Sequence, residues 1–138
     1  AIVALAILMP IGSAIGGAAG SQALTVAVRA LATKDLTPAN SLRVLGRETA
    51  TGVLNGVALA AVLATIATLW FADPWLGGVV GAAMVFTITA AGLIGIAVPL
   101  VMHRLGVDPA LASGTFVTTC VDALGFMSFL GLATLILL

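Results

Sequence analysis

Four long apolar stretches, separated by short charged segments, dominate the hydropathy pattern of this 138-residue chain. A helix needs roughly 20 mainly apolar residues to cross the hydrocarbon core of a bilayer, and each stretch reaches that length. The pattern therefore predicts a single all-α domain over residues 1–138, a polytopic membrane bundle of four transmembrane helices. With their amphipathic ends included, the spans are expected at about 1–33, 41–72, 76–103 and 109–138.

Prolines and glycines mark the places where these helices are expected to depart from straight rods. The first span contains Pro10, followed by four glycines between residues 12 and 20. Proline removes a helix hydrogen bond, and each glycine weakens a helix by about 1 kcal/mol. This span is therefore expected to form two helical pieces or a bent helix. Pro99 predicts a kink near the end of the third span, and Pro109 is expected in the first turn of the fourth.

The composition places the chain in a membrane and excludes several other classes of protein. It is 62% hydrophobic and 7% charged, with a mean hydropathy of +1.29, whereas a soluble domain carries about 25% charged residues. The lipid bilayer is thus the expected surrounding. The net charge is zero and no basic run is present, so no nucleic-acid partner is expected. The sequence has no nucleotide-binding loop, catalytic triad or zinc-spaced cluster, which argues against an enzyme.

The distribution of basic residues predicts the orientation in the membrane. All five lie near the junctions of the first two spans and of the last two, while the turn Trp70–Trp75 between the middle spans has none. Cytoplasmic loops carry the excess of Lys and Arg, and tryptophans favour the interface. We therefore expect a multi-pass protein of the cell (inner) membrane, with both ends of this chain on the outer side. Because the chain begins inside an apolar stretch without methionine, we expect it to be part of a longer protein.

Asp122 is the one charged residue between Pro109 and Leu138. A carboxylate at the centre of a membrane helix costs roughly 2.5–3.5 kcal/mol on insertion scales, and such residues mark ion pathways. No base lies at a similar depth to pair with it. We interpret Asp122 as a cation ligand. The alternative is a protonated or paired aspartate that holds helices together.

Helical spacing predicts which residues share a face with Asp122. They are Thr115, Thr118, Thr119, Gly125 and Phe126. The hydroxyls fall on the cytoplasmic side of the carboxylate and would form a polar stripe leading to it. Hard cations such as Mg²⁺ and Ca²⁺ prefer oxygen ligands, and Mg²⁺ gives up its waters reluctantly. One carboxylate cannot hold such an ion alone, but two copies facing each other across a dimer axis could hold a hydrated one.

Two further groups are candidates for the walls of such a pathway. The run from Gly16 to Ala23 contains small residues that permit close helix packing, or whose loosened backbone could expose carbonyls beside Ser21 and Gln22. In the second span, Glu48 and Asn55 lie on one helical face with Gly52 and Leu59. That face is either a cation vestibule or a solvated helix end with one interhelical hydrogen bond.

Three segments of the chain resemble the membrane domain of the MgtE-type magnesium transporters. The first is Gly16–Ala23 with Val28–Thr33, and the second is Arg47–Glu48 with Asn55–Gly56. The third and most specific is Arg104–Gly114, continuing through Thr118 and Thr119 to Asp122 and Gly125. Together they extend the resemblance over essentially the whole chain.

The resemblance implies five membrane helices, of which this chain would hold helices two to five. It implies a homodimer with a pore at the two-fold axis, in which Asp122 helps bind hydrated Mg²⁺. Cytosolic regulatory domains would lie outside this chain. Candidate pore-lining residues are Thr115, Thr118, Thr119, Gly125, Gly17, Ala18, Gly20, Ser21 and Asn55, with Glu48 in a vestibule.

Three positions differ from the usual pattern of that family. The family usually has asparagine at the position of Ala18 and often at that of Gly92, and commonly proline at that of Thr115. The two asparagine differences remove amide oxygens from the neighbourhood of the pore and bear on its selectivity among divalent cations.

Three hypotheses follow for the function. The first is a homodimeric, channel-like transporter that passes divalent cations, chiefly Mg²⁺, into the cytoplasm through a pore with Asp122 as ligand. The second is a proton- or sodium-coupled carrier in which Asp122 changes its protonation. The third is a membrane scaffold that transports nothing.

Overall fold

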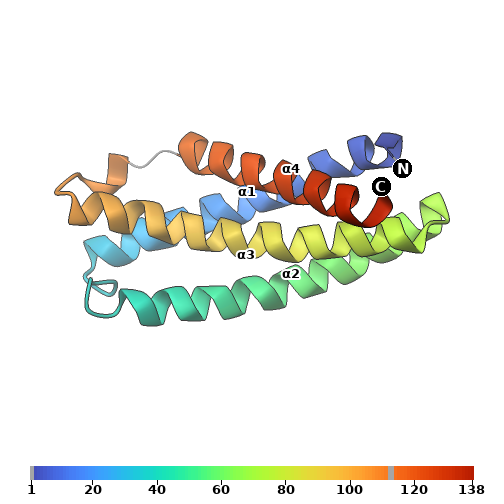
Figure 1. Ribbon diagram of the computed structural model, residues 1–138. Coiled ribbons are helices and arrows are strands. Elements are labelled where there is room, and N and C mark those ends of the chain that lie inside the picture. Colours follow the sequence, from blue (N-terminus) through green and yellow to red (C-terminus); the bar gives the residue numbers. More distant parts are fainter. Residues whose placement is uncertain (1, 112–113) are drawn as a thin grey trace.

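The computed structural model describes residues 2–111 and 114–138, and within those ranges the only regular elements are helices, joined by short turns (Figure 1). Its elements are α1 (Ile2–Ala32), α2 (Ser41–Phe71), α3 (Pro74–Arg104), the short 3-10 helix η1 (Pro109–Leu111) and α4 (Gly114–Leu137). Each α-helix is long and apolar enough to cross a membrane. The predicted all-α bundle with four candidate spans is confirmed.

The first helix continues through Pro10 and the glycines that follow it. Of the two forms predicted for this span, separate helical pieces are wrong. The reason lies in tertiary contact: a Cβ atom on Gly12 would lie 2.6 Å from the Phe129 ring, and one on Gly16 would lie 2.7 Å from Thr87 Cγ2. These glycines let α1 approach α3 and α4 closely, and packing at the contact offsets their weak helix propensity.

The fourth helix begins later than predicted. Pro109 starts η1, which ends at Leu111, whereas α4 begins at Gly114. Asp108 caps the start of η1: its carboxylate accepts a hydrogen bond from the Ala110 N–H at 3.0 Å. The start of an α-helix at Pro109 is therefore wrong, because the turn that Asp108 caps is a 3-10 helix.

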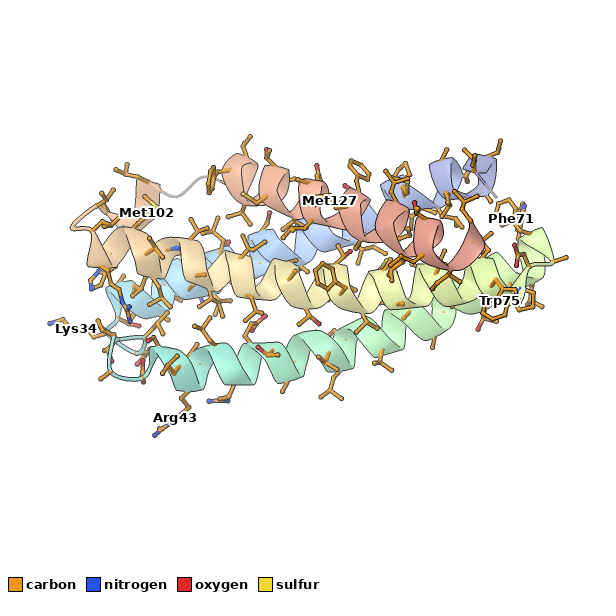
Figure 2. All side chains as sticks on the ribbon, viewed as in Figure 1. Lys34, Arg43, Phe71, Trp75, Met102 and Met127 are labelled. Carbon is orange, nitrogen blue, oxygen red and sulfur yellow. The ribbon has the colours of Figure 1, made fainter. Side chains whose placement is uncertain are left out.

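The α2–α3 turn is built around Asp73. Its carboxylate caps α3 by accepting hydrogen bonds from the N–H groups of Trp75 (3.0 Å) and Leu76 (3.2 Å), and Pro74 occupies the first helical position. Figure 2 shows Trp75 and Phe71 at one end of the bundle and Lys34 and Arg43 at the other. The chain thus has a tryptophan end and a basic end. The start of α1 and the end of α4 lie toward the tryptophan end (Figure 1).

Small residues bring α2 and α3 into close antiparallel contact. The residues Gly52, Gly56, Ala60 and Ala64 recur every four positions along α2 and face α3. A Cβ atom on Gly52 would lie 2.9 Å from Thr89 Cα, and one on Gly56 would lie 2.9 Å from Val85 Cα. Backbones this close require small side chains, as in other membrane helix pairs.

The third helix is the centre of the bundle. Its residues Val79, Ala83, Met84 and Ala91 are fully buried, and α1, α2 and α4 all pack against it. Figure 1 shows α3 between α2 on one side and α1 with α4 on the other. Over the described ranges α1 and α2 scarcely touch each other. The pair α1 and α4 and the single helix α2 therefore pack on different sides of α3, which connects them.

Candidate ion-binding seam between α1 and α4

Three residues spaced four apart on α1 face three residues spaced four apart on α4. Ser13 pairs with Asp122, Gly17 with Thr118, and Ser21 with Gly114. The two helices run antiparallel, so the pairs form one continuous line along the helix contact. We call this line of six residues the α1–α4 seam. Apart from the two glycines, every member carries a side-chain oxygen.

Asp122 lies at the edge of this seam, half-buried, about 12 Å from the start of α4 at the helical rise of about 1.5 Å per residue. The Ser13 hydroxyl donates a hydrogen bond to its Oδ1 atom. No Lys, Arg or His pairs with Asp122 in the part of the chain that the structure describes. An ionised carboxylate has about four lone-pair sites, so one hydroxyl leaves most of its capacity unused.

Thr118 continues the seam one turn from Asp122. It is half-buried, and a Cβ atom on Gly17 would lie 3.4 Å from its Cγ2 methyl and 4.0 Å from its Oγ1. At the basic end of the seam, the Ser21 hydroxyl oxygen lies 3.9 Å from the Cβ position of Gly114. Both sets of distances are those of ordinary van der Waals contact, so α1 and α4 touch along this line and these hydroxyls lie at their contact.

The structure divides the face that was predicted around Asp122. Thr115, Thr119 and Phe126 are exposed on the outer surface of α4. Gly125 is instead buried against α3, where its Cβ position lies 3.3 Å from Thr87 Cγ2. The Thr119 hydroxyl donates to the Thr115 carbonyl at 2.8 Å, so its oxygen still has capacity to accept.

The predicted wall residues of α1 also separate. Gly17 and Ser21 lie on the α1–α4 seam, while Gly20 is buried next to Val117 and Val121. Ala18 is exposed and contributes nothing to the seam within this chain.

Glu48 and Asn55 belong to a different part of the bundle. They line a pocket of about 220 Å³ between α1, α2 and α3, with Gln22 of α1 and Gly92 of α3. The α1–α4 seam is on the other side of α1. The structure therefore does not bring these two residues to Asp122.

Ser13 is the seam residue that sequence reasoning missed. It is the one polar side chain between residues 2 and 20, and it precedes Gly17 and Ser21 at intervals of four. That spacing was a usable signal. The neighbouring glycines obscured it, because they favour a role for the backbone instead of the hydroxyl.

The chemistry of the seam suits a hydrated hard cation. Its side-chain ligands are one carboxylate and three hydroxyls, all of them oxygens, which Mg²⁺ and Ca²⁺ prefer. No group of three or more His, Cys, Asp or Glu side chains that could hold a metal occurs among the described residues. An ion here would keep most of its waters, which agrees with the reluctance of Mg²⁺ to lose them.

Comparison with known proteins identifies the family. The MgtE family model, described as a divalent cation transporter, matches residues 9–132, which include all six residues of the seam. The chain belongs to the MgtE family. With four apolar helices, it is a multi-pass membrane segment of an MgtE-family protein.

Three MgtE proteins are similar over nearly the whole chain. The magnesium transporter MgtE of Thermus thermophilus is 39% identical over 137 residues, covering 99% of this chain and 30% of that protein. The magnesium transporter MgtE of Enterococcus faecalis is 37% identical over 131 residues, covering 95% of this chain and 29% of that protein. The magnesium transporter MgtE of Bacillus subtilis is 33% identical over 133 residues, covering 96% and 30%. The chain thus spans about 30% of the length of these MgtE relatives.

Proposed function

We propose that this MgtE-family chain forms the ion pathway of a transporter that carries Mg²⁺ across the membrane, with Asp122 as the ligand of the passing ion. The observation that carries the proposal is a half-buried carboxylate on an oxygen-bearing helix contact inside an apolar bundle. The three MgtE proteins to which the chain is similar are named magnesium transporters. Other divalent cations with oxygen preference would fit the same ligands.

The pathway runs between two copies of the chain in this proposal. A single carboxylate cannot neutralise a divalent ion, and Asp122 is open on the side where α4 exposes Thr115, Thr119 and Phe126. A second copy placed against this face would bring a second Asp122 toward the first. The threonines would then line the route from the basic end, and Gly17, Ala18 and Ser21 of α1 would form its neighbouring wall.

The Ser13 hydroxyl orients the ligand. It holds Oδ1 of Asp122 against α1, which leaves Oδ2 available to the waters around an ion. Hydrogen bonds to a charged group contribute about 1.5–3 kcal/mol. Ser13 is therefore a positioning residue for the proposed site.

The membrane potential supplies the driving force. Moving one elementary charge across 100 mV is worth about 2.3 kcal/mol, so a divalent ion gains about 4.6 kcal/mol. Uptake into a negative interior needs no ATP site on this account. The rest of the full-length protein would hold the regulatory domains that open and close the route.

Flux measurements on the full-length protein in liposomes test the proposal. Asp122→Ala and Asp122→Asn should reduce Mg²⁺ flux to that of protein-free liposomes while leaving insertion and oligomeric state unchanged. Asp35→Asn is the matched control, because Asp35 is an exposed loop carboxylate bonded to Thr33 (2.8 Å) at the basic end. Wild-type flux from either Asp122 variant would refute the assignment.

A further inference from the structure

Glu48 lies on the face of α2 that contacts α3, where the following residues at the same spacing are small. It comes four residues before Gly52, in line with Gly52, Gly56 and Ala60. The space for its side chain comes from Gly92 on α3, where a Cβ atom would overlap Oε1 of Glu48 and lie 3.2 Å from its Cδ and Cγ. The carboxylate thus lies directly on the α3 backbone.

The Glu48 carboxylate opens into the pocket between α1, α2 and α3. Carboxamides from two other helical positions, Gln22 and Asn55, line the same pocket of about 220 Å³. Val26, Ile88 and Ile96 form apolar parts of its wall. The polar groups therefore converge from α1 and α2 over a floor made by α3.

None of these three polar side chains has a partner among the described residues. Glu48, Gln22 and Asn55 make no hydrogen bond or ion pair there. The hydroxyl of Thr89, which faces Gly52 of α2, is also buried without a partner among the described residues, but it lies outside the lining of the pocket. Glu48 lies about 10 Å from the start of α2 at the usual helical rise. Gln22 and Asn55 are exposed, but Glu48 is half-buried in an apolar bundle. A carboxylate withdrawn from water without a partner is costly, so it requires water, an ion or a proton.

The chemistry of the polar side chains that line the pocket distinguishes among water, an ion and a proton as its occupant. These side chains supply one carboxylate and two neutral amide oxygens, without imidazole or sulfur ligands, and hard cations prefer such oxygens. A water takes about 30 Å³ of liquid volume, so a pocket of about 220 Å³ can hold about seven waters, or an ion with its first hydration shell. Protonation of Glu48 alone would leave the convergence of two carboxamides on the same pocket unexplained.

We propose that Glu48, with Gln22 and Asn55, binds a hydrated divalent cation at a second site, on the opposite side of α1 from Asp122. This site lies within one copy of the chain and needs no partner subunit. It is separate from the α1–α4 seam, so ion binding at Glu48 does not depend on Asp122 carrying the transported ion. Gly92 is an essential part of the site because it leaves room for the carboxylate.

Binding of Mn²⁺ as a Mg²⁺ substitute tests the second site. The full-length protein in nanodiscs is titrated with Mn²⁺, free Mn²⁺ is measured by electron paramagnetic resonance, and Mg²⁺ is added as competitor. Glu48→Gln should lose one bound ion per chain relative to wild type. Asp122→Asn should keep that ion, whatever its effect on transport. Equal Mn²⁺ binding by Glu48→Gln and wild type would overturn the proposal and leave Glu48 as a protonated, structural residue.

A glycine pair provides the matched control. Gly92→Ala places a methyl group where the Glu48 carboxylate lies, and should weaken Mn²⁺ binding at this site about 10-fold or more, as loss of ligand orientation does in other metal sites. Gly46→Ala, on the same end of α2, meets no atom within 4 Å and should bind as wild type does. If Gly92→Ala folds poorly, Asn55→Ala on the exposed rim of the pocket should show the same weakening. Unchanged affinity in both variants would contradict the site.

Discussion

The hydroxyl of Ser13 on α1 donates a hydrogen bond to the carboxylate of Asp122 on α4, across 109 residues of sequence. This contact joins the first and last helices of the bundle at the one charged residue of the last span. It places the acid at a helix contact and not on an isolated lipid-facing surface. Gly17 with Thr118, and Ser21 with Gly114, extend the same contact toward the basic end.

Ser13→Ala should weaken Mg²⁺ transport without abolishing it. The carboxylate remains but loses the donor that orients it, and loss of such outer partners costs about 10-fold or more in metal affinity. The readout is the Mg²⁺ concentration that gives half-maximal flux in liposomes, which should rise while the maximal flux changes less.

Two variants separate orientation from general damage in that experiment. Ser13→Thr keeps the hydroxyl, so its half-maximal Mg²⁺ concentration should equal that of the wild type. Ser128→Ala removes another α4 hydroxyl, which bonds to Thr87 (3.2 Å) and to the Gly125 carbonyl (2.8 Å) and not to Asp122, and should leave the Mg²⁺ dependence unchanged. A Ser13→Ala protein with normal half-maximal concentration would remove Ser13 from the site.

Gly56→Ala should destabilise the bundle. Its new Cβ atom would lie 2.9 Å from Val85 Cα and 3.3 Å from the Val85 carbonyl oxygen, so α2 and α3 must separate. Overpacking of this kind costs about 1–3 kcal/mol. The midpoint of thermal unfolding in detergent should fall. Gly78→Ala, inside α3 at a position with nothing within 4 Å, should unfold at or above the wild-type temperature, because alanine favours a helix more than glycine does. Equal midpoints for both variants would contradict the close α2–α3 contact.

Flux through the full-length protein should follow membrane voltage and not the proton gradient. A divalent ion moving through the pathway carries its own charge, whereas a coupled carrier would need Asp122 to release and take up protons. Liposomes with a potassium diffusion potential, negative inside, should take up Mg²⁺ at the same rate with and without a pH difference. Uptake that disappears when the pH difference is removed at constant voltage would favour the coupled carrier.

Asp73→Ala should lower the stability of the bundle, because it weakens the start of α3 at the tryptophan end. It removes the cap that accepts from the Trp75 and Leu76 N–H groups, and loss of an N-cap costs about 0.5–2 kcal/mol. Asp73→Asn keeps an accepting oxygen and should retain most of the stability. Mg²⁺ flux per folded protein should be the same in both variants, since the cap is at the far end from the seam hydroxyls.

The amino-acid sequence by itself determined the class of this protein and the approximate ranges of its helices, apart from the start of α4. In lipid, the backbone N–H and C=O groups of a long apolar run must bond to each other within a helix, because no water is present to bond them. The charged loops and the Trp70–Trp75 turn marked where those helices end. The MgtE resemblance is carried by residues along the whole chain, so the sequence alone was enough to indicate it, and the family comparison confirmed it.

Only the tertiary structure decided which polar residues share a site. Helical spacing puts Ser13, Glu48 and Asp122 on faces of their own helices, but it does not say which helices touch. Because α1 and α2 pack separately on α3, Asp122 meets Ser13 while Glu48 meets Gly92, on opposite sides of α1. The same contacts keep α1 helical through Pro10 and its glycines, since close packing offsets what local propensity opposes.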